Sequence, residues 1–166
     1  MEKLVQLLIR KTYFFYQDKH YSWLKKQPLF NEKLIKILNS TIKDPLLFFD
    51  GFETSLSNNI YGGKFTRERE IWENFLLAEH HIYLNKHFLF NLLGCQNHNP
   101  LTKLFDFAKL IETIAHEVAH CLITDLYQIE EEHGELHQKI TNELEEYLWS
   151  LSLVKEWETK IYALQK

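Results

Sequence analysis

The sequence predicts an α+β domain in which a small antiparallel or mixed sheet packs on one central helix, with helices before the sheet and a long helix at the C-terminal end. Residues 100–126 carry apolar side chains at the spacing of an amphipathic helix. Residues 58–85 contain short runs typical of strands. Residues 135–164 again follow helical spacing. No repeat, low-complexity tract or linker divides the chain, which predicts a single domain over 1–166.

The N-terminal part is expected to be helical. Residues 2–17 carry an apolar stripe at helical spacing and predict a first helix. Pro28 ends the element before it, because the residue preceding a proline is pushed out of the helical region. Asn31 is a good cap for a second helix over 32–39. A turn or short strand over 44–49 then leads towards the sheet.

The strands are expected in the segment that follows. Residues 59–65 can form one strand, broken by a pair of glycines. Residues 71–78 are ambiguous between helix and strand. Residues 80–85 alternate well enough to predict a strand, and 86–93 predict a short helix ended by a glycine.

The central helix carries a chemical motif, the run HEVAH at positions 116–120. Pro100 suits the first turn of this helix and Asn99 is a good cap before it. Because a helix advances by about 100° per residue, the two histidines lie on one face about one turn apart, where they can share one metal ion. Glu117 lies beside them, where a carboxylate can take a proton from a zinc-bound water.

A catalytic zinc needs a third protein ligand and a fourth position open to water. Metzincins have glycine and histidine where this chain has Ile123 and Leu126, so that class of peptidase is excluded. His133 is a candidate third ligand, and Gly134 after it allows a tight turn or a helix start against the metal. The alternative is a carboxylate ligand from the C-terminal helix, where the candidates are Glu143, Glu145 and Glu146.

The spacing of these residues resembles that of the SprT-like (Spartan-type) zinc metallopeptidases, in which HExxH is followed at about this distance by a His-Gly pair. The residues that carry the resemblance are His116, Glu117, His120, His133 and Gly134. Upstream, Gly62-Gly63-Lys64-Phe65 and His81-Ile82-Tyr83-Leu84-Asn85 look like the strands that precede the zinc helix in that family. The resemblance covers about residues 58–140.

This resemblance implies a zincin-like fold and hydrolysis of peptide bonds in protein substrates. It also implies a Zn²⁺ ion held by His116, His120 and His133, with Glu117 as general base. Some members of the family act on proteins bound or crosslinked to DNA. The strand His81–Asn85 would border the cleft and pair with the extended backbone of a substrate.

The chain departs from the family pattern at two points. His137 stands where the family often has a bulky aromatic residue, and with only Cys95 and Cys121 no four-cysteine zinc ribbon can form. His137 follows His133 by one helical turn, so it can face the same pocket as a substitute ligand or as a donor that stabilises the oxyanion of the transition state. Tyr127 is a second candidate donor. Small gluzincin-like peptidases use a glutamate ligand, which keeps Glu143 open as the third ligand.

Charge is unevenly distributed along the chain. The net charge is −4, whereas residues 1–43 contain nine lysines and arginines against three acidic residues. Aromatic residues interleave this basic segment, a mixture that can bind single-stranded nucleic acid. The alternative is an amphipathic helix with its aromatic residues in the core, which the sequence pI near 6.1 favours. We expect a protein or peptide substrate as the main partner and weak nucleic-acid binding at most.

The sequence also suggests a compartment. The apolar run over residues 4–9 is short and interrupted by Gln6, so no secretory signal is evident. No stretch approaches the 18 or so apolar residues of a membrane span. We expect a cytoplasmic protein with no membrane partner, although export without an N-terminal signal would leave the same pattern. The competing functional hypothesis is a non-enzymatic helical interaction module, in which any metal is structural or absent.

Overall fold

The computed structural model describes residues 2–24, 46–48, 63–72, 75–84, 100–129 and 133–163. The predicted helices over 32–39 and 86–93 lie outside these ranges. The helices are α1 (Glu2–Leu24), α4 (Pro100–Leu122), α5 (Glu135–Ser150) and α6 (Ser152–Ala163), and a π-helical turn, η1 (Ile123–Tyr127), follows α4. The strands are β1 (Leu46–Phe48), β2 (Gly63–Trp72) and β3 (Phe75–Leu84).

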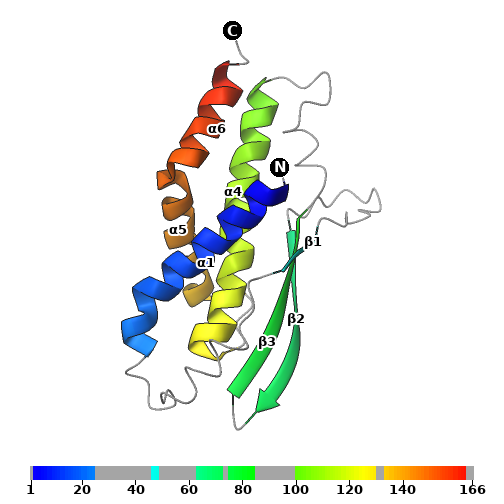
Figure 1. The fold of residues 1–166 in the computed structure, drawn as a ribbon, viewed down its shortest axis with the longest axis vertical. Coiled ribbons are helices and arrows are strands. Elements are labelled where there is room, and N and C mark those ends of the chain that lie inside the picture. Colours follow the sequence, from blue (N-terminus) through cyan, green and yellow to red (C-terminus); the bar gives the residue numbers. More distant parts are fainter. Residues whose placement is uncertain are drawn as a thin grey trace.

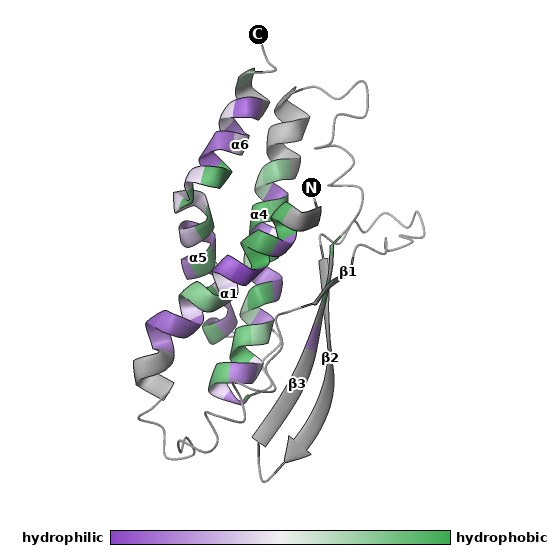
Figure 2. Cartoon of the chain, viewed as in Figure 1, coloured by the Kyte–Doolittle hydropathy of each residue, from purple (hydrophilic) through white to green (hydrophobic). Residues whose placement is uncertain are grey.

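Helix α4 is the central element of the described structure. Helices α1, α5 and α6 pack against it, and the sheet lies along its other side (Figure 1). Apolar residues recur along α4, as the hydropathy colouring of Figure 2 shows, and Ile111, Ile114, Ala115, Val118 and Leu122 are fully buried. A helix that is apolar around so much of its surface is stable only when other elements cover it on several sides.

The sheet is small and mixed, with strand order β1-β3-β2. Strands β2 and β3 form an antiparallel hairpin from Gly63 paired with Leu84 to Trp72 paired with Phe75. Strand β1 runs parallel to β3 and pairs with residues 81–83. Residues 80–84 of the strand expected at 80–85 are the end of the longer strand β3, and residues 71–72 and 75–78 of the ambiguous segment belong to the paired strands.

The predicted α+β, zincin-like class is wrong for the part of the chain that the structure describes. Of the residues whose side chains are placed, 89% are helical. All the buried apolar side chains recorded in the core except Ile82 and Leu84 come from helices. The core is therefore formed between helices, and the class is helical, with the three short strands as a flanking element. Amphipathic helices of this length cover one another, so a sheet is not needed as a second layer of the core.

The predicted C-terminal helix over 135–164 is divided in two. Leu151 has extended backbone angles (φ −67°, ψ 131°) and separates α5 from α6. Ser150 bonds the carbonyl oxygen of Tyr147 at 2.6 Å through its hydroxyl, a contact that competes with helical hydrogen bonding. The break lets α6 return to the core, where the Trp157 ring lies 5.7 Å from that of Phe107 on α4.

The central helix also ends earlier than predicted. Regular α-helix stops at Leu122, and the last predicted turn is the π-helical η1. Gln128 then adopts a left-handed conformation (φ 57°) and donates its side-chain amide to the carbonyl oxygens of Thr124 and Asp125, both at 3.0 Å. These contacts satisfy carbonyl groups that a helix end leaves without partners.

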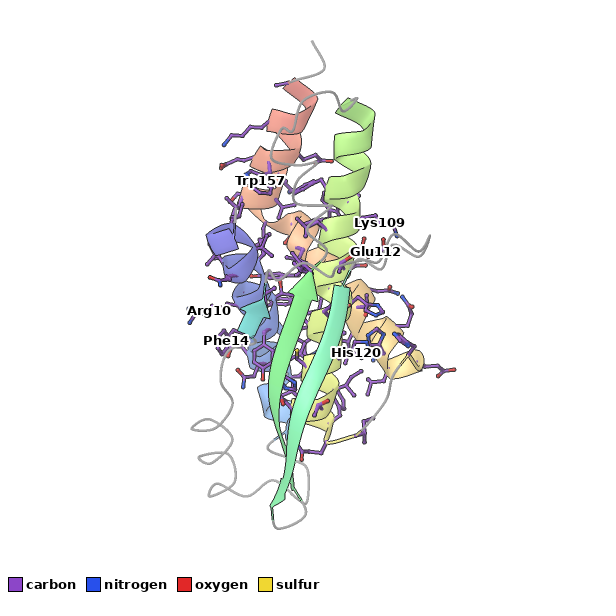
Figure 3. The ribbon with its side chains drawn as sticks, turned by 90° about the vertical axis from the view of Figure 1, so that its right-hand side faces the viewer. Arg10, Phe14, Lys109, Glu112, His120 and Trp157 are labelled. Atoms are coloured by element: carbon purple, nitrogen blue, oxygen red, sulfur yellow. The ribbon has the colours of Figure 1, made fainter. Side chains whose placement is uncertain are left out.

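Helix α1 is longer than the predicted 2–17 and supplies part of the core. Tyr13 and Tyr16 are buried, so these two aromatic rings are not available to stack on nucleic-acid bases. Phe14 is 39% exposed on the outer face, close to Arg10 (Figure 3). None of the helices in the described ranges combines the length and apolar character needed to cross a membrane.

Leu144 tests this helical core. It is fully buried on α5. Leu144→Ala should lower the free energy of unfolding by about 2–5 kcal/mol, because the lost methyl groups leave a cavity. Urea denaturation measures this loss. The matched control is Glu146→Ala on the exposed face of the same helix, which should change stability by less than about 0.5 kcal/mol. Equal losses in the two variants would contradict the packing of α5.

Candidate metal centre

Three histidines from two helical segments meet at the surface of the structure. His116 and His120 lie one turn apart on α4, with ring centroids separated by 5.0 Å. The ring of His133, just before α5, lies 5.1 Å from each of them. One nitrogen from each ring lies within 4.8 Å of the other two. The packing of α5 on α4 therefore brings together the three residues that the sequence predicted as ligands.

One nitrogen–nitrogen distance in the cluster is close to that of two ligands on a tetrahedral metal ion. The Nε2 atoms of His116 and His133 are 3.2 Å apart. Zinc–nitrogen bonds of about 2.0–2.1 Å at tetrahedral angles separate two ligand nitrogens by about 3.3–3.4 Å. Two imidazole nitrogens at this distance either share a proton or face one cation. The donor set of three imidazoles is one that zinc accepts in catalytic sites.

The surroundings of His116 keep its imidazole neutral. Burial, and to a smaller extent the nearby His137 and His133, lower the pKa of His116 to about 4. Glu112, one turn earlier on α4, acts in the opposite direction and raises the pKa of His116. Its carboxylate also accepts a hydrogen bond from Lys109 at 2.5 Å (Figure 3). A metal binds the neutral form of imidazole, so a low pKa leaves a lone pair available at neutral pH.

The cluster is open to solvent on one side. His133 is exposed, while His116 and His120 are partly exposed. Gly134 is the residue before the first turn of α5 and has an extended conformation (φ −82°, ψ −171°), so the predicted helix start at the His-Gly pair is present. A metal held here by three imidazoles would keep a position accessible to water or substrate.

Glu117 lies beside the cluster but deeper in the protein. Its side chain is 4% exposed, and no hydrogen bond or ion pair joins its carboxylate to another described residue. Burial raises the pKa of Glu117 to about 8. The carboxyl group therefore holds a proton more strongly than an exposed glutamate, which is a property required of a group that exchanges protons near neutral pH.

Glu143, the rival third ligand, is placed elsewhere. Its carboxylate forms an ion pair with Lys19 of α1, and His20 lies 3.8 Å from the same oxygen. This ion pair holds the Glu143 side chain against α1. The three residues that share one potential metal position are His116, His120 and His133.

His137 lies within the same cluster of rings. Its ring centroid is 4.1 Å from that of His120 and 4.5 Å from that of His116. The side chain is buried, and its Nε2 donates a hydrogen bond to the backbone oxygen of His116 at 3.2 Å. His137 thus contributes both a buried ring and a polar contact to this cluster.

Tyr127, the second candidate donor, is engaged with α1. Its hydroxyl oxygen lies 2.9 Å from that of Tyr16. Burial, followed by this contact with Tyr127, raises the pKa of Tyr16. The roles of Tyr127 and His137 as transition-state stabilisers stay predictions.

The predicted substrate-binding strand, His81–Asn85, has a different place from the one expected. Strand β3 is central in the sheet, and residues 81–83 pair with β1 on one side and with β2 on the other. Asn85 lies outside the described residues. Because both backbone edges are already paired, His81, Ile82 and Tyr83 cannot also pair with a substrate backbone, and the expected substrate pairing is replaced by the pairing with β1.

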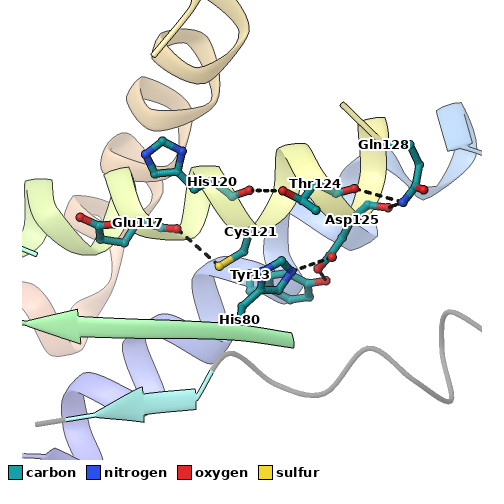
Figure 4. Close-up of polar contacts among 8 residues, drawn as sticks. All are labelled: Tyr13, His80, Glu117, His120, Cys121, Thr124, Asp125 and Gln128. Atoms are coloured by element: carbon teal, nitrogen blue, oxygen red, sulfur yellow. Dashed lines mark hydrogen bonds and ion pairs between the residues drawn. The ribbon is translucent and has the colours of Figure 1, made fainter. Parts of the chain in front are cut away.

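A second polar cluster was not anticipated from the sequence. Asp125 of η1 accepts hydrogen bonds from Tyr13 of α1 at 2.7 Å and from His80 of β3 at 2.6 Å (Figure 4). All three side chains are buried. The signal was the position of Asp125, which continues the buried stripe of Val118 and Leu122 at helical spacing. An acidic residue on an apolar stripe predicts a buried partner.

Comparisons with protein-family models, with curated proteins and with solved structures gave no match for this chain. The proposal below therefore draws on the geometry of the described residues and on the motif they form.

The raised pKa of Glu117 predicts a pH effect on the stability of the metal-free protein. Between about pH 4.5 and 8 the folded state holds a proton that the unfolded state has lost, so stability falls as pH rises. Glu117→Gln removes this loss. Thermal and urea unfolding in a chelator give the free energy of unfolding of both chains. The free energy of unfolding of the variant minus that of the native chain should increase by more than about 1 kcal/mol from pH 5 to pH 8. Glu146→Gln should show no such gain, and a gain that is flat with pH would refute the burial effect.

Asp125 is expected to stabilise the fold without contributing to metal binding. Asp125→Ala leaves the Tyr13 hydroxyl and the His80 ring nitrogen without their acceptor, which should lower the free energy of unfolding by about 2–4 kcal/mol. Asp125→Asn keeps one acceptor and should lose less. Urea denaturation gives the losses, and zinc content should be the same in both variants. A loss under about 0.5 kcal/mol for Asp125→Ala would contradict the role of this cluster.

Proposed function

We propose that this protein is a zinc-dependent peptidase in which His116, His120 and His133 bind the metal and Glu117 is the general base. The observation that carries the proposal is the convergence of the three imidazoles, with two nitrogens 3.2 Å apart, beside a buried glutamate of raised pKa. The HEVAH motif and the downstream His-Gly pair support the same function, since they resemble the SprT-like metallopeptidases.

Each group has a distinct part in this chemistry. Zinc, when bound, supplies a Lewis acid that polarises a peptide carbonyl and makes water more acidic. Glu117 takes the proton from the attacking water and delivers it to the departing amine. Burial raises the proton affinity of Glu117 above that of an exposed glutamate, which suits its holding the proton before the amine departs. A cation bound beside Glu117 would lower this pKa and favour the carboxylate that accepts the proton from water.

The openness of the site supports a protein or peptide substrate. His133 is exposed, so an extended chain can approach the ligand cluster from solvent without rearrangement of the helical core. The buried tyrosines of α1 do not favour nucleic acid as a direct partner of that helix. Weak binding of nucleic acid through the basic residues beyond α1 stays a prediction, because Lys25 to Lys43 lie outside the described residues.

Two substitutions separate metal binding from catalysis. Purified native chain should contain about one zinc per molecule and hydrolyse labelled casein. His120→Ala should lose both properties, because it removes a ligand. Glu117→Gln should keep zinc and lose hydrolysis by about 100-fold or more, because the amide cannot accept a proton. Metal analysis by mass spectrometry and a fluorescence assay measure the two properties.

The controls fix the ligand set. Glu156→Gln, on the exposed side of α6, should leave zinc content and hydrolysis unchanged. His133→Ala should weaken zinc binding far more than Glu143→Ala, whose carboxylate pairs with Lys19. The reverse ranking would assign the third ligand to Glu143. A native chain that takes up no zinc would refute the proposal and favour the non-enzymatic interaction module.

A further inference from the structure

His137 holds a place in the cluster that the proposed chemistry does not use. It lies one turn after His133, and its ring is as close to the rings of His116 and His120 as those of the proposed ligands are to one another. Four imidazoles therefore gather where three suffice. A fourth nitrogen ligand would close the position that a catalytic zinc keeps open for water, so the role of His137 matters for the whole site.

The hydrogen bond of His137 indicates which of its two ring nitrogens carries the proton. A carbonyl oxygen only accepts, so the contact with His116 requires His137 Nε2 to carry the proton and donate it. In this tautomer Nε2 has no lone pair to give to a metal, whereas Nδ1 keeps one. The nitrogen geometry sets that second atom apart, because the group of ligand atoms that lie within 4.8 Å of one another comes from His116, His120 and His133 and includes neither ring nitrogen of His137.

The acceptor of this bond belongs to a ligand residue. In a regular helix the backbone oxygen of His116 already accepts the amide proton of His120, and its second lone pair remains. His137 uses that second lone pair from the neighbouring helix. The bond thus ties the first turn of α5 directly to the turn of α4 that holds both ligands of the motif.

The third ligand is positioned by the same contact. His133 lies just before α5, and Gly134 accepts the first helical hydrogen bond of α5 from Gln138 at 3.1 Å. Any shift of this first turn relative to α4 moves His133 away from His116. The ring of His137 is buried and lies at a tilt of 35° against the ring of His120, with centroids 4.1 Å apart, so it opposes such a shift.

We infer that His137 is a positioning residue for the proposed metal centre: its Nε2–H bond to the His116 backbone oxygen holds the third ligand, His133, in register with the HEVAH pair. This inference rests on the proposed zinc site and adds a residue that does not itself bind the metal. Partners that orient ligands in this way typically change metal affinity by about 10–100-fold when removed.

Two replacements of His137 separate the hydrogen bond from the volume of the ring. His137→Phe keeps an aromatic ring but has no donor. His137→Gln carries an amide nitrogen near the position of Nε2 and can donate to the same oxygen. Zinc dissociation constants of the full chain, measured by competition with a chromophoric chelator, should rise about 10–100-fold in His137→Phe and by less than about threefold in His137→Gln. Unfolding of both variants in chelator, without metal, should be alike, so a general loss of packing cannot produce this difference.

The visible absorption of the cobalt-substituted protein distinguishes a ligand from a positioning residue. The native chain and His137→Gln should give the same spectrum, with the band intensity of a site that has three imidazole ligands. A changed spectrum together with loss of one ligand in either variant would overturn the inference by making His137 a ligand. Equal zinc affinity in His137→Phe and the native chain would overturn it as well. Absence of zinc binding by the native chain would instead refute the proposed function.

Discussion

The packing of α5 against the C-terminal half of α4 is the contact on which the candidate site depends. Helix α4 presents two histidines by its own periodicity, but the third reaches them only because α5 begins beside the same turn. Buried apolar residues hold this interface, among them Val118 and Leu122 on α4 and Ile140 and Leu144 on α5. The hydrogen bond from His137 to the His116 backbone adds a directional contact, which non-directional apolar packing does not provide. Stability and the proposed metal binding thus share one interface.

Two buried carboxyl groups about two helical turns apart in this region have opposite environments. Asp125 accepts hydrogen bonds from Tyr13 and His80 and so links α1, η1 and β3. Glu117 is buried without such partners, and its pKa rises to about 8 for that reason. A fold gains nothing from a buried carboxyl group that lacks partners, because its charged form is costly there. The burial of Glu117 is in keeping with the proton transfer proposed for it, whereas the burial of Asp125 is accounted for by its two hydrogen bonds.

The flanking sheet limits how a substrate can lie. Strand β3 is paired on both sides over residues 81–83, so a substrate backbone cannot join the sheet there. The most exposed residue of the histidine cluster is His133, just before the start of α5. The helical class of the described structure and the openness at His133 are consistent with one another, since the site is a feature of two helices and the segment just before one of them.

Local patterns in the sequence were sufficient to predict some features of the structure. The periodicity of residues 100–126 predicted a helix, the spacing of His116 and His120 placed them on one face, and the His-Gly pair marked the start of another helix; the structure confirms these three predictions. The zinc, the peptidase activity and the resemblance to SprT-like enzymes stay predictions. The sequence did not reveal the helical class, the break at Leu151, the π-helical end of α4, the Tyr13–Asp125–His80 cluster or the bond from His137 to His116. The break at Leu151 and the end of α4 involve local contacts, from Ser150 to Tyr147 and from Gln128 to Thr124 and Asp125. The helical class, the buried cluster and the bond from His137 depend on side chains far apart in the chain, because helical spacing fixes which face a residue takes, but only the packing of one element on another decides what that face meets.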